Sequence, residues 1–183
     1  MIDLRDVEPD DALRLFKWRC EPEVDRWMYS EPPTWERHQA WFSDFVADPD
    51  RHGWIIQTKG QPVGSLTLTG LTGTQKRAQW GWYIGDAEAR GRGAGRAAQA
   101  LGLDQAFGRF ELQKVWAEVL ADNETALRAQ SAAGFRREGY LRRHLFKHGQ
   151  FRDVALLAIL SEEWARRRGP VMKDLVRSGL VAG

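Results

Sequence analysis

Apolar residues in this chain alternate with polar ones over some short runs and recur every three or four residues over others. Alternation predicts half-buried strands, and the wider spacing predicts amphipathic helices. We expect strands at residues 1–7, 53–58, 63–69, 77–84, 114–120, 135–145 and 151–160. We expect helices at residues 10–19, 22–29, 96–107, 123–133 and 161–168, and another that Thr34 caps and Asp48 ends. Strands and helices therefore mix along the whole chain.

The length and composition indicate one domain. A chain of 183 residues with 43% hydrophobic residues can bury one substantial core and is too short for two generous ones. We expect this domain to cover residues 1–168. Residues 169–183 are expected to form a C-terminal tail that is either mobile or packed on a partner subunit.

Charge and cysteine content exclude several classes of protein. The net charge is +2 and the basic residues are scattered, which gives no case for nucleic-acid binding. The lone Cys20 excludes an internal disulfide, and residues 1–5 lack an apolar signal region. No apolar run has the length of a membrane span. We therefore expect a cytoplasmic protein with neither nucleic acid nor membrane as partner, and with no metal site.

A glycine cluster stands between the strand expected at 77–84 and the helix expected at 96–107. Residues 90–95 read Arg-Gly-Arg-Gly-Ala-Gly. Glycine permits backbone conformations closed to other residues, and the unpaired N–H groups at the start of a helix attract anions. The segment therefore predicts a phosphate-binding turn.

The residues that follow exclude two other phosphate loops. Counting from Gly91 and Gly93, a dinucleotide fingerprint would need a third glycine where Arg96 stands. A P-loop would need Lys and then Ser or Thr after its last glycine, but Gly95 is followed by Arg96 and Ala97. Neither NAD nor a nucleoside triphosphate is indicated.

The spacing Arg90-x-x-Gly93-x-Gly95 resembles the pyrophosphate loop of the GNAT acetyltransferases, which move an acetyl group from acetyl-CoA to an amine. The expected order of elements is similar to the GNAT fold over residues 2–167. The resemblance implies an α+β fold with a mixed central sheet of about seven strands and helices on both faces. It also implies acetyl-CoA as the acetyl donor and a possible homodimer.

The resemblance assigns three groups of residues to the cofactor. A bulge in the strand before the loop would offer backbone hydrogen bonds to the pantetheine arm at Trp82, Tyr83 and Ile84. The loop would hold the pyrophosphate through Arg90, Gly91, Arg92, Gly93, Ala94 and Gly95. Asn123, followed by Ala126, would contact the pantetheine or its thioester. The two loop arginines have a second reading as ordinary solvated cations.

The first fifty residues narrow the resemblance. The runs Phe16-Lys17-Trp18-Arg19 and Trp27-Met28-Tyr29-Ser30, with His38 and Trp41, look like the pseudaminic-acid-pathway UDP-4-amino-sugar N-acetyltransferases. The implied acceptor site consists of Arg19, Met28, Tyr29, His38 and Trp41. Cations and flat aromatic faces suit a nucleotide sugar. The implied pathway is nonulosonic (pseudaminic) acid biosynthesis for flagellar glycosylation.

Plainer readings exist for two of these acceptor residues. His38 could be a helix residue at the boundary of the core, and we weigh this equally with a functional role. Arg19 could interact through its charge with the C-terminus of its helix. Its place in the resemblance, close to Met28 and Tyr29, favours substrate contact.

Acetyl transfer to an amine requires a group that removes a proton from the ammonium form. Glu118, in the strand expected at 114–120, is the expected base, because the similar sugar acetyltransferases carry theirs at this position. Periodicity alone favours a polar residue on the open face of a half-buried strand. The family resemblance reverses that preference.

The group that protonates the departing thiolate stays open at this stage. Many family members carry a tyrosine seven residues after the asparagine, where this chain has Gln130, and some carry a serine where it has Ala126. Ser131, Tyr83 and water are the remaining candidates. A thiol with a pKa of about 8.5 is easily protonated by water, so a dedicated acid is not required.

Two other functions remain open. The first is acetyl transfer from acetyl-CoA to a different acceptor: a protein N-terminus, a polyamine or an aminoglycoside. Arg19 and Arg26 among the aromatic residues favour an anionic nucleotide over a polycation. The second is a non-catalytic CoA-binding module, which the loss of tyrosine at Gln130 favours and the intact glycine loop disfavours.

Overall fold

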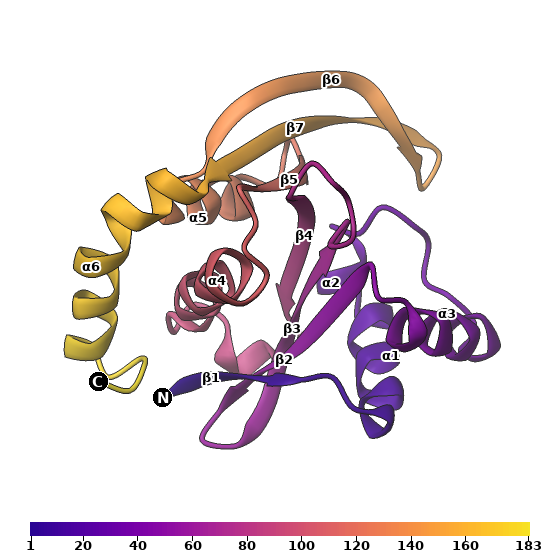
Figure 1. Cartoon of the computed structure of the whole chain (residues 1–183). Coiled ribbons are helices and arrows are strands. Elements are labelled where there is room, and N and C mark those ends of the chain that lie inside the picture. The colour runs from indigo at the N-terminus through magenta and orange to yellow at the C-terminus, as the bar shows by residue number, and fades with distance from the viewer.

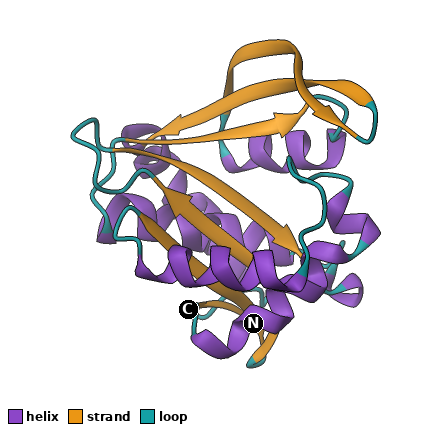
Figure 2. Cartoon of the chain, turned by 90° about the vertical axis from the view of Figure 1, so that its right-hand side faces the viewer, coloured by secondary structure: helices purple, strands orange, loops and turns teal.

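The computed structural model describes all 183 residues and consists of one mixed sheet with helices packed around it (Figures 1 and 2). The strands are β1 (Ile2–Asp6), β2 (Arg51–Thr58), β3 (Gln61–Thr69), β4 (Arg77–Ile84), β5 (Lys114–Leu120), β6 (Arg136–Lys147) and β7 (Gln150–Leu160). The helices are α1 (Ala12–Cys20), α2 (Pro22–Asp25), α3 (Trp35–Ala47), α4 (Ala94–Asp104), α5 (Glu124–Ala133) and α6 (Ser161–Arg177). Short helical turns lie at η1 (Pro9–Asp11), η2 (Ala87–Ala89) and η3 (Gln105–Arg109, a π-helical turn). The expected α+β class is confirmed.

The sheet has the strand order β1-β2-β3-β4-β5-β7-β6, and every pair is antiparallel except β4 with β5. This parallel pair is held by only three residue pairs, which run from Arg77↔Lys114 to Gln79↔Trp116. Beyond Gln79 the two strands part. The second half of β4 therefore bonds to β3 alone, and one of its edges has no strand partner.

The expected bulge in β4 is absent from its pairing with β3. Those two strands keep an unbroken register from Gly64↔Ile84 to Thr69↔Gln79. The divergence of β4 from β5 supplies the free backbone edge that the bulge was expected to provide.

Successive residues of β2 point to opposite faces of the sheet. The central residues of β2 are all buried, so both faces of the sheet are covered. Trp54 and Ile56 belong to the main core, together with residues of α4 and α6. Ile55 lies in a second cluster with Leu15 of α1 and Phe42 of α3. Figure 1 shows the corresponding layers, with α4 and α6 on one side of the sheet and α1 and α3 on the other.

Several helix boundaries follow from local sequence signals. Thr34 caps α3 by accepting a hydrogen bond from the Arg37 N–H at 3.4 Å. Asn123 caps α5 in the same way through the Ala126 N–H at 3.1 Å. Gly134 ends α5 with φ 111°, a left-handed value that favours glycine. The predicted cap at Thr34 is confirmed, and the helix predicted at 123–133 begins one residue later than expected.

The prediction for the C-terminal segment is wrong in length and in packing. Helix α6 continues through Pro170 to Arg177, so the boundary predicted at residue 168 lies inside it. The residues before Pro170 are exposed, and water can satisfy the carbonyl that loses its N–H partner there. Leu175 and Val181 are buried in the main core, and the Ile2 N–H donates to the Leu180 carbonyl at 2.6 Å. The tail thus packs on its own chain.

The helix predicted at 22–29 is also shorter than expected and ends at Asp25. The carbonyls of Met28 and Ser30 accept hydrogen bonds from Lys147 and Arg19 instead of continuing a helix. Tertiary contacts therefore decide the conformation of this segment.

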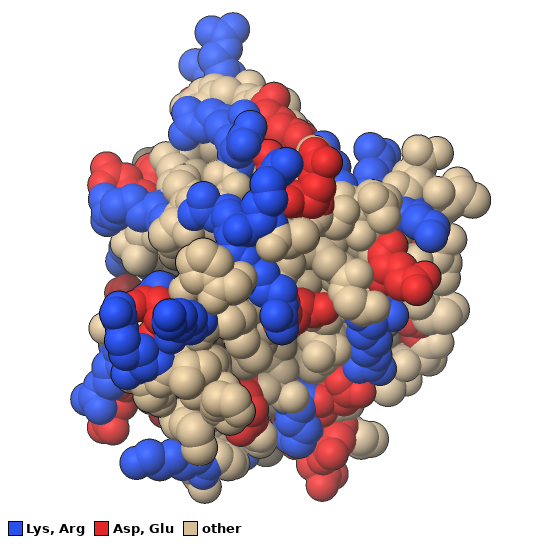
Figure 3. Space-filling view, turned by 60° about the vertical axis from the view of Figure 1, so that its left-hand side comes forward, with Lys and Arg blue, Asp and Glu red and all other residues tan.

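The outer surface shows no segregation of charge on the face in Figure 3, where Lys and Arg side chains are interspersed with Asp and Glu. No helix combines the length and the apolar composition that crossing a membrane requires.

Candidate active site

A cavity of about 1190 Å³ opens where β4 and β5 part. Its walls come from these two strands, from the glycine loop and the first turns of α4 and α5, and from α1, α2 and α3. The structure brings most of the predicted site residues to this one cavity. They are Arg19, Met28, Tyr29, His38, Trp41, Trp82, Tyr83, Ile84, Arg90, Gly91, Gly93, Gly95, Glu118, Asn123 and Ala126.

The glycine loop has the geometry of an anion site. Gly91 and Gly93 have φ values of 72° and 86°, in the left-handed region where a side chain is strained. Gly93 is the N-cap of α4, and its carbonyl accepts the first helical bond, from the Ala97 N–H at 3.0 Å. The N–H groups before Ala97 have no helical partner and are available to a bound anion.

The cationic residues of this loop do not all face the cavity. Arg90 donates from Nε to the Ile84 carbonyl at 2.9 Å and from a terminal nitrogen to the Gly85 carbonyl at 3.0 Å. Its guanidinium therefore ties the loop to the end of β4. Arg92 lies outside the cavity lining on the surface, and Ala94 is buried in the main core. Backbone groups, more than side chains, make this end of the site.

Glu118 and Tyr29 both line the cavity and lie close to each other. Glu118 is half-buried on β5, and its carboxylate forms no ion pair within the chain. The Tyr29 hydroxyl is buried, and no hydrogen-bond partner lies within 3.5 Å of it. Burial raises the pKa of Tyr29, and hydrogen bonding to the Glu118 carboxylate, together with its negative charge, raises it further. The phenol thus stays protonated and is directed at the Glu118 carboxylate, so a ligand amine could bond to both groups.

Arg19 lines the cavity from α1, but its hydrogen-bond donors are used within the protein. It donates to the Asp25 carboxylate at 2.8 Å, to the Ser30 carbonyl at 2.5 Å and to the Ser30 hydroxyl at 2.9 Å. Asp25 neutralises its charge. These contacts favour a role in holding the segment around Tyr29 over direct binding of a substrate anion.

His38 and Trp41 form part of an aromatic wall on α3. His38 is 3% exposed, and its Nε2 lies 2.8 Å from the Ala12 carbonyl, to which it donates as the neutral tautomer. Burial lowers the pKa of His38. Trp41 is 44% exposed and stacks on Phe45 at 5.3 Å between ring centroids. His38 therefore supports the wall, whereas Trp41 offers a free aromatic face.

Gln130 occupies the position where many family members carry tyrosine. It is 3% exposed, and its Oε1 is buried without a hydrogen-bond partner while the residue lines the cavity. A buried acceptor of this kind costs free energy until something donates to it. The carboxamide is therefore placed to bind a polar group of a ligand, although it cannot act as an acid.

Sequence reasoning missed Asp25 and Lys147, which lie next to this cavity. Lys147 is at the end of β6, beside the turn of the β6–β7 hairpin, and its Nζ lies 3.0 Å from Asp25 Oδ1. No local pattern marked either residue, because they are 122 positions apart.

Asp25, Glu31 and His148 also place possible metal-ligand atoms within 4.8 Å of one another. Asp25 is already matched by two cations, which leaves little negative charge there for a metal ion.

The start of α4 suits a phosphate-bearing ligand, and the unpaired carboxylate in the same cavity can act as a general base. The model of the acetyltransferase (GNAT) domain matches residues 2–136, and the chain belongs to this family of N-acetyltransferases. The predicted fold, enzyme class and use of acetyl-CoA are thereby confirmed.

Relatives with known names support the same class. The uncharacterized N-acetyltransferase YnaD of Bacillus subtilis is 31% identical over 162 residues, which cover 88% of this chain and 94% of the relative. A spermidine N(1)-acetyltransferase of Escherichia coli is 23% identical over 164 residues, with 89% and 88% covered. The structure of a spermidine N-acetyltransferase from Vibrio cholerae in complex with CoA and spermine superposes with a TM-score of 0.84 at 20% identity, covering 90% of this chain and 98% of that one.

These comparisons do not support the narrower resemblance to UDP-amino-sugar acetyltransferases. The relatives whose names include an acceptor are spermidine acetyltransferases. The identity of the acceptor therefore depends on the residues that line the cavity.

Proposed function

We propose that this protein transfers the acetyl group of acetyl-CoA to a primary amine of a small cationic molecule, with a polyamine as the leading acceptor. The observation that carries the proposal is the unpaired Glu118 carboxylate, which shares one cavity with the glycine loop. The acceptor amine would lie at Glu118 and Tyr29, two neighbouring polar groups that line the cavity.

The cofactor end of the cavity fits acetyl-CoA. The open N–H groups at the start of α4 suit the pyrophosphate, and the free edge of β4 from Trp82 to Ile84 suits the amide groups of the pantetheine arm. The side chains of Asn123 and Gln130 line the same path. Acetyl-CoA supplies the activated acetyl group there, and its C–S bond breaks as the new C–N bond forms.

The acceptor enters as an ammonium ion and must lose a proton before it can act as a nucleophile. Glu118 would take this proton, directly or through one water molecule, and would become a neutral carboxylic acid. The Tyr29 oxygen would accept a hydrogen bond from a second N–H of the amine and so orient it. The amine then attacks with its lone pair, and the remaining surplus proton is lost to water.

The departing thiolate would take its proton from water. Burial raises the pKa of Tyr83, which makes this phenol a poorer acid, and the same holds for Tyr29. Gln130 has no proton to give at this pH. Since a thiol has a pKa of about 8.5, protonation by solvent is adequate.

The charges around the acceptor favour a cation. Arg19, the residue on which binding of a nucleotide was expected to depend, is engaged by Asp25 at 2.8 Å, and Arg26 is paired with Glu23 at 3.3 Å, so neither guanidinium is free for a substrate anion. Glu118 is a cavity-lining carboxylate that has no cationic partner. The spermidine acetyltransferases among the relatives give independent support.

A nucleotide-linked amino sugar, as in pseudaminic acid biosynthesis, is the second candidate acceptor. Arg37 lines the cavity from α3 and has no carboxylate partner, and Trp41 presents an exposed aromatic face close by. A diphosphate and a uracil ring could use this pair. A protein N-terminus and an aminoglycoside share the same chemistry with less support from these side chains.

A thiol-release assay with acetyl-CoA would test the proposal against four acceptors: spermidine, a UDP-4-amino-sugar, an aminoglycoside and a short peptide with a free N-terminus. We expect turnover with spermidine. Turnover with the nucleotide sugar alone would establish the second candidate. Tight CoA binding without turnover on any amine would contradict the proposed enzyme and favour a non-catalytic CoA-binding module.

A further inference from the structure

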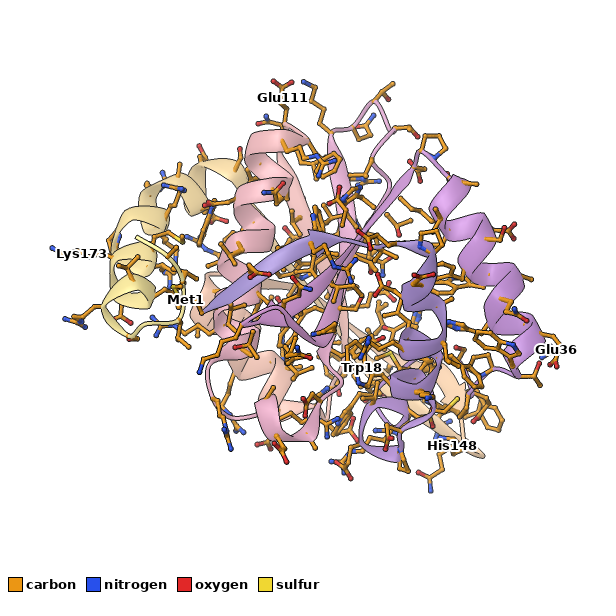
Figure 4. The ribbon with its side chains drawn as sticks, turned by 90° about the horizontal axis from the view of Figure 1, so that it is seen from below. Met1, Trp18, Glu36, Glu111, His148 and Lys173 are labelled. Carbon is orange, nitrogen blue, oxygen red and sulfur yellow. The ribbon has the colours of Figure 1, made fainter.

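The tip of the β6–β7 hairpin reaches across the acceptor end of the molecule to the segment that carries Tyr29 (Figure 1). Its contact residue is Lys147, which is 2% exposed although lysine is almost always at the surface. Figure 4 shows the adjoining residue His148 beside the end of the molecule formed by α1 and α2.

All three N–H donors of the Lys147 ammonium group are used on one short segment. Nζ donates to the Asp25 carbonyl, to Asp25 Oδ1 at 3.0 Å and to the Met28 carbonyl at 2.8 Å. A lysine has exactly these three donors and no acceptor, so the group is saturated. The Met28 carbonyl belongs to the peptide group that immediately precedes Tyr29.

Arg19 holds the same segment from the other side of Tyr29. Its guanidinium bonds to the Ser30 carbonyl and to Asp25 Oδ1, the oxygen atom that Lys147 also contacts. Tyr29 therefore lies between two backbone carbonyls, each fixed by a cation, and the two cations share one carboxylate. We call Arg19, Asp25 and Lys147 the ion clamp.

The turn of the hairpin adds a further attachment. His148 lies 3.1 Å from Asp25 Oδ2 through Nε2 and 3.0 Å from Glu31 through Nδ1, and its backbone N–H donates to Glu31 Oε1 at 3.1 Å. The hairpin is thus tied to both ends of the segment from Asp25 to Glu31. This segment has little regular structure of its own, so its conformation depends on these contacts.

We propose that Lys147 is a positioning residue for acetyl transfer: through the ion clamp it fixes the backbone beside Tyr29 and so aims the Tyr29 hydroxyl at the acceptor amine. This inference rests on the proposed function, because Tyr29 is assigned there to the amine. Lys147 does not line the cavity, so it would act on the reaction without touching either substrate. The clamp should govern the acceptor and leave acetyl-CoA unaffected, since the glycine loop and β4 take no part in it.

The test compares Lys147→Met with Arg142→Met, a control that removes an exposed cation from the same strand. Arg19 still neutralises Asp25 in Lys147→Met, so the variant does not leave a buried carboxylate uncompensated. We expect kcat/KM for the acceptor to fall about tenfold or more, and the Kd for CoA to stay within about twofold. Arg142→Met should match the wild type in both.

A double-mutant cycle separates positioning from a general loss of structure. If Lys147 acts through Tyr29, then Tyr29→Phe should lower kcat/KM much less in the Lys147→Met background than in the wild type. In the Arg142→Met background, Tyr29→Phe should keep its full effect. Fully additive losses in the first cycle would overturn the proposal.

Hydrogen exchange of the free protein tests the clamp without any activity. Amides of residues 26–31 should exchange at least about tenfold faster in Lys147→Met, while those of β4 and α4 stay unchanged. Unchanged exchange at 26–31 would overturn the proposal, whereas faster exchange in an enzyme inactive on every amine would leave the clamp standing and remove only the proposed function. Lys147→Gln, which keeps a donor for the Met28 carbonyl, is a second variant. Failure of both variants to fold would count against a positioning role.

Discussion

Gly95 lies directly against the indole ring of Trp82: a Cβ built on this glycine would be 2.9 Å from Trp82 Cζ3. Gly95 is in the first turn of α4 and Trp82 is on β4, so the contact joins the glycine loop to the strand that lines the cofactor end of the cavity. Cβ atoms do not approach carbon this closely. The third glycine of the loop is therefore required by packing as well as by the approach of a ligand.

Gly95→Ala should weaken the binding of CoA. The added methyl group must displace the Trp82 ring or the start of α4, and either movement disturbs the cofactor path. We expect the Kd for CoA, measured by calorimetry, to rise by about tenfold or more. Gly108→Ala is the matched control, because no atom lies within 4 Å of its added Cβ, and its Kd should be unchanged. Equal affinities for the two variants would show that the contact does not matter for the cofactor.

Glu118→Gln should remove most of the turnover and little of the cofactor affinity. The amide keeps the shape of the carboxylate but cannot accept the proton of the ammonium. General base catalysis contributes about a hundredfold or more, so we expect kcat to fall by at least that factor. Glu162→Gln, at an exposed position on α6, is the control. A Glu118→Gln variant with normal kcat on the best acceptor would exclude Glu118 as the base.

Tyr29→Phe should separate activity from stability. The Tyr29 hydroxyl is buried with no hydrogen-bond partner within 3.5 Å, so its removal relieves a poorly satisfied polar group. We expect the free energy of unfolding to rise by up to about 1 kcal/mol, while kcat/KM for the acceptor falls. Urea denaturation and steady-state kinetics on the same preparation would measure both. A loss of stability would indicate that the hydroxyl has a partner in the folded protein, and an unchanged kcat/KM would remove Tyr29 from the acceptor site.

Asp25 should make the ion clamp sensitive to acid. Its burial favours the neutral form, but the hydrogen bonds and charges of Arg19 and Lys147 outweigh this and hold the pKa of Asp25 below its usual value. His148 faces the same carboxylate from the hairpin turn. A carboxylate with a lowered folded pKa stabilises the protein above its unfolded pKa of about 3.9, and this stabilisation is lost as the pH falls through the folded value.

The measurement is the difference in Tm between the wild type and Asp25→Asn. The wild type should be the more stable at pH 7, and the difference should shrink as the pH falls below about 4. Asp153→Asn is the comparison variant. Asp153 also has a lowered pKa, because its carboxylate accepts hydrogen bonds from the Arg143 backbone and the Tyr140 hydroxyl. A difference for Asp25→Asn that stays constant from pH 7 to pH 3 would contradict the assigned direction of the pKa shift.

Much of the fold could be predicted because its signals are local. The strand at Lys114–Leu120 has the predicted bounds, and the caps at Thr34, Asn123 and Gly134 fall where the sequence indicates them. The length of α6 was missed because a glycine and a proline at residues 169 and 170 mark a helix end in most contexts. Burial of Leu175 in the core outweighs that local preference.

The sequence predicts which residues line the candidate site. It does not predict which of their side chains are already bonded to other residues of the protein. The motif and the resemblance brought Glu118, Tyr29 and the glycines together, and the structure places them in one cavity. The contacts of Arg19 with Asp25, and of Arg90 with the end of β4, could not be inferred. Whether an arginine is free or engaged depends on partners whose positions only the fold determines.

The sequence by itself determined the order of elements, the glycine turn before α4 and the carboxylate on β5, because periodicity, glycine spacing and residue type are properties of neighbouring positions. Only the tertiary structure decided that the tail completes the core and that Lys147 meets Asp25 across 122 residues. It also decided which charges remain free for a substrate. Burial and ion pairing join residues that are distant along the chain, and no local pattern encodes that proximity.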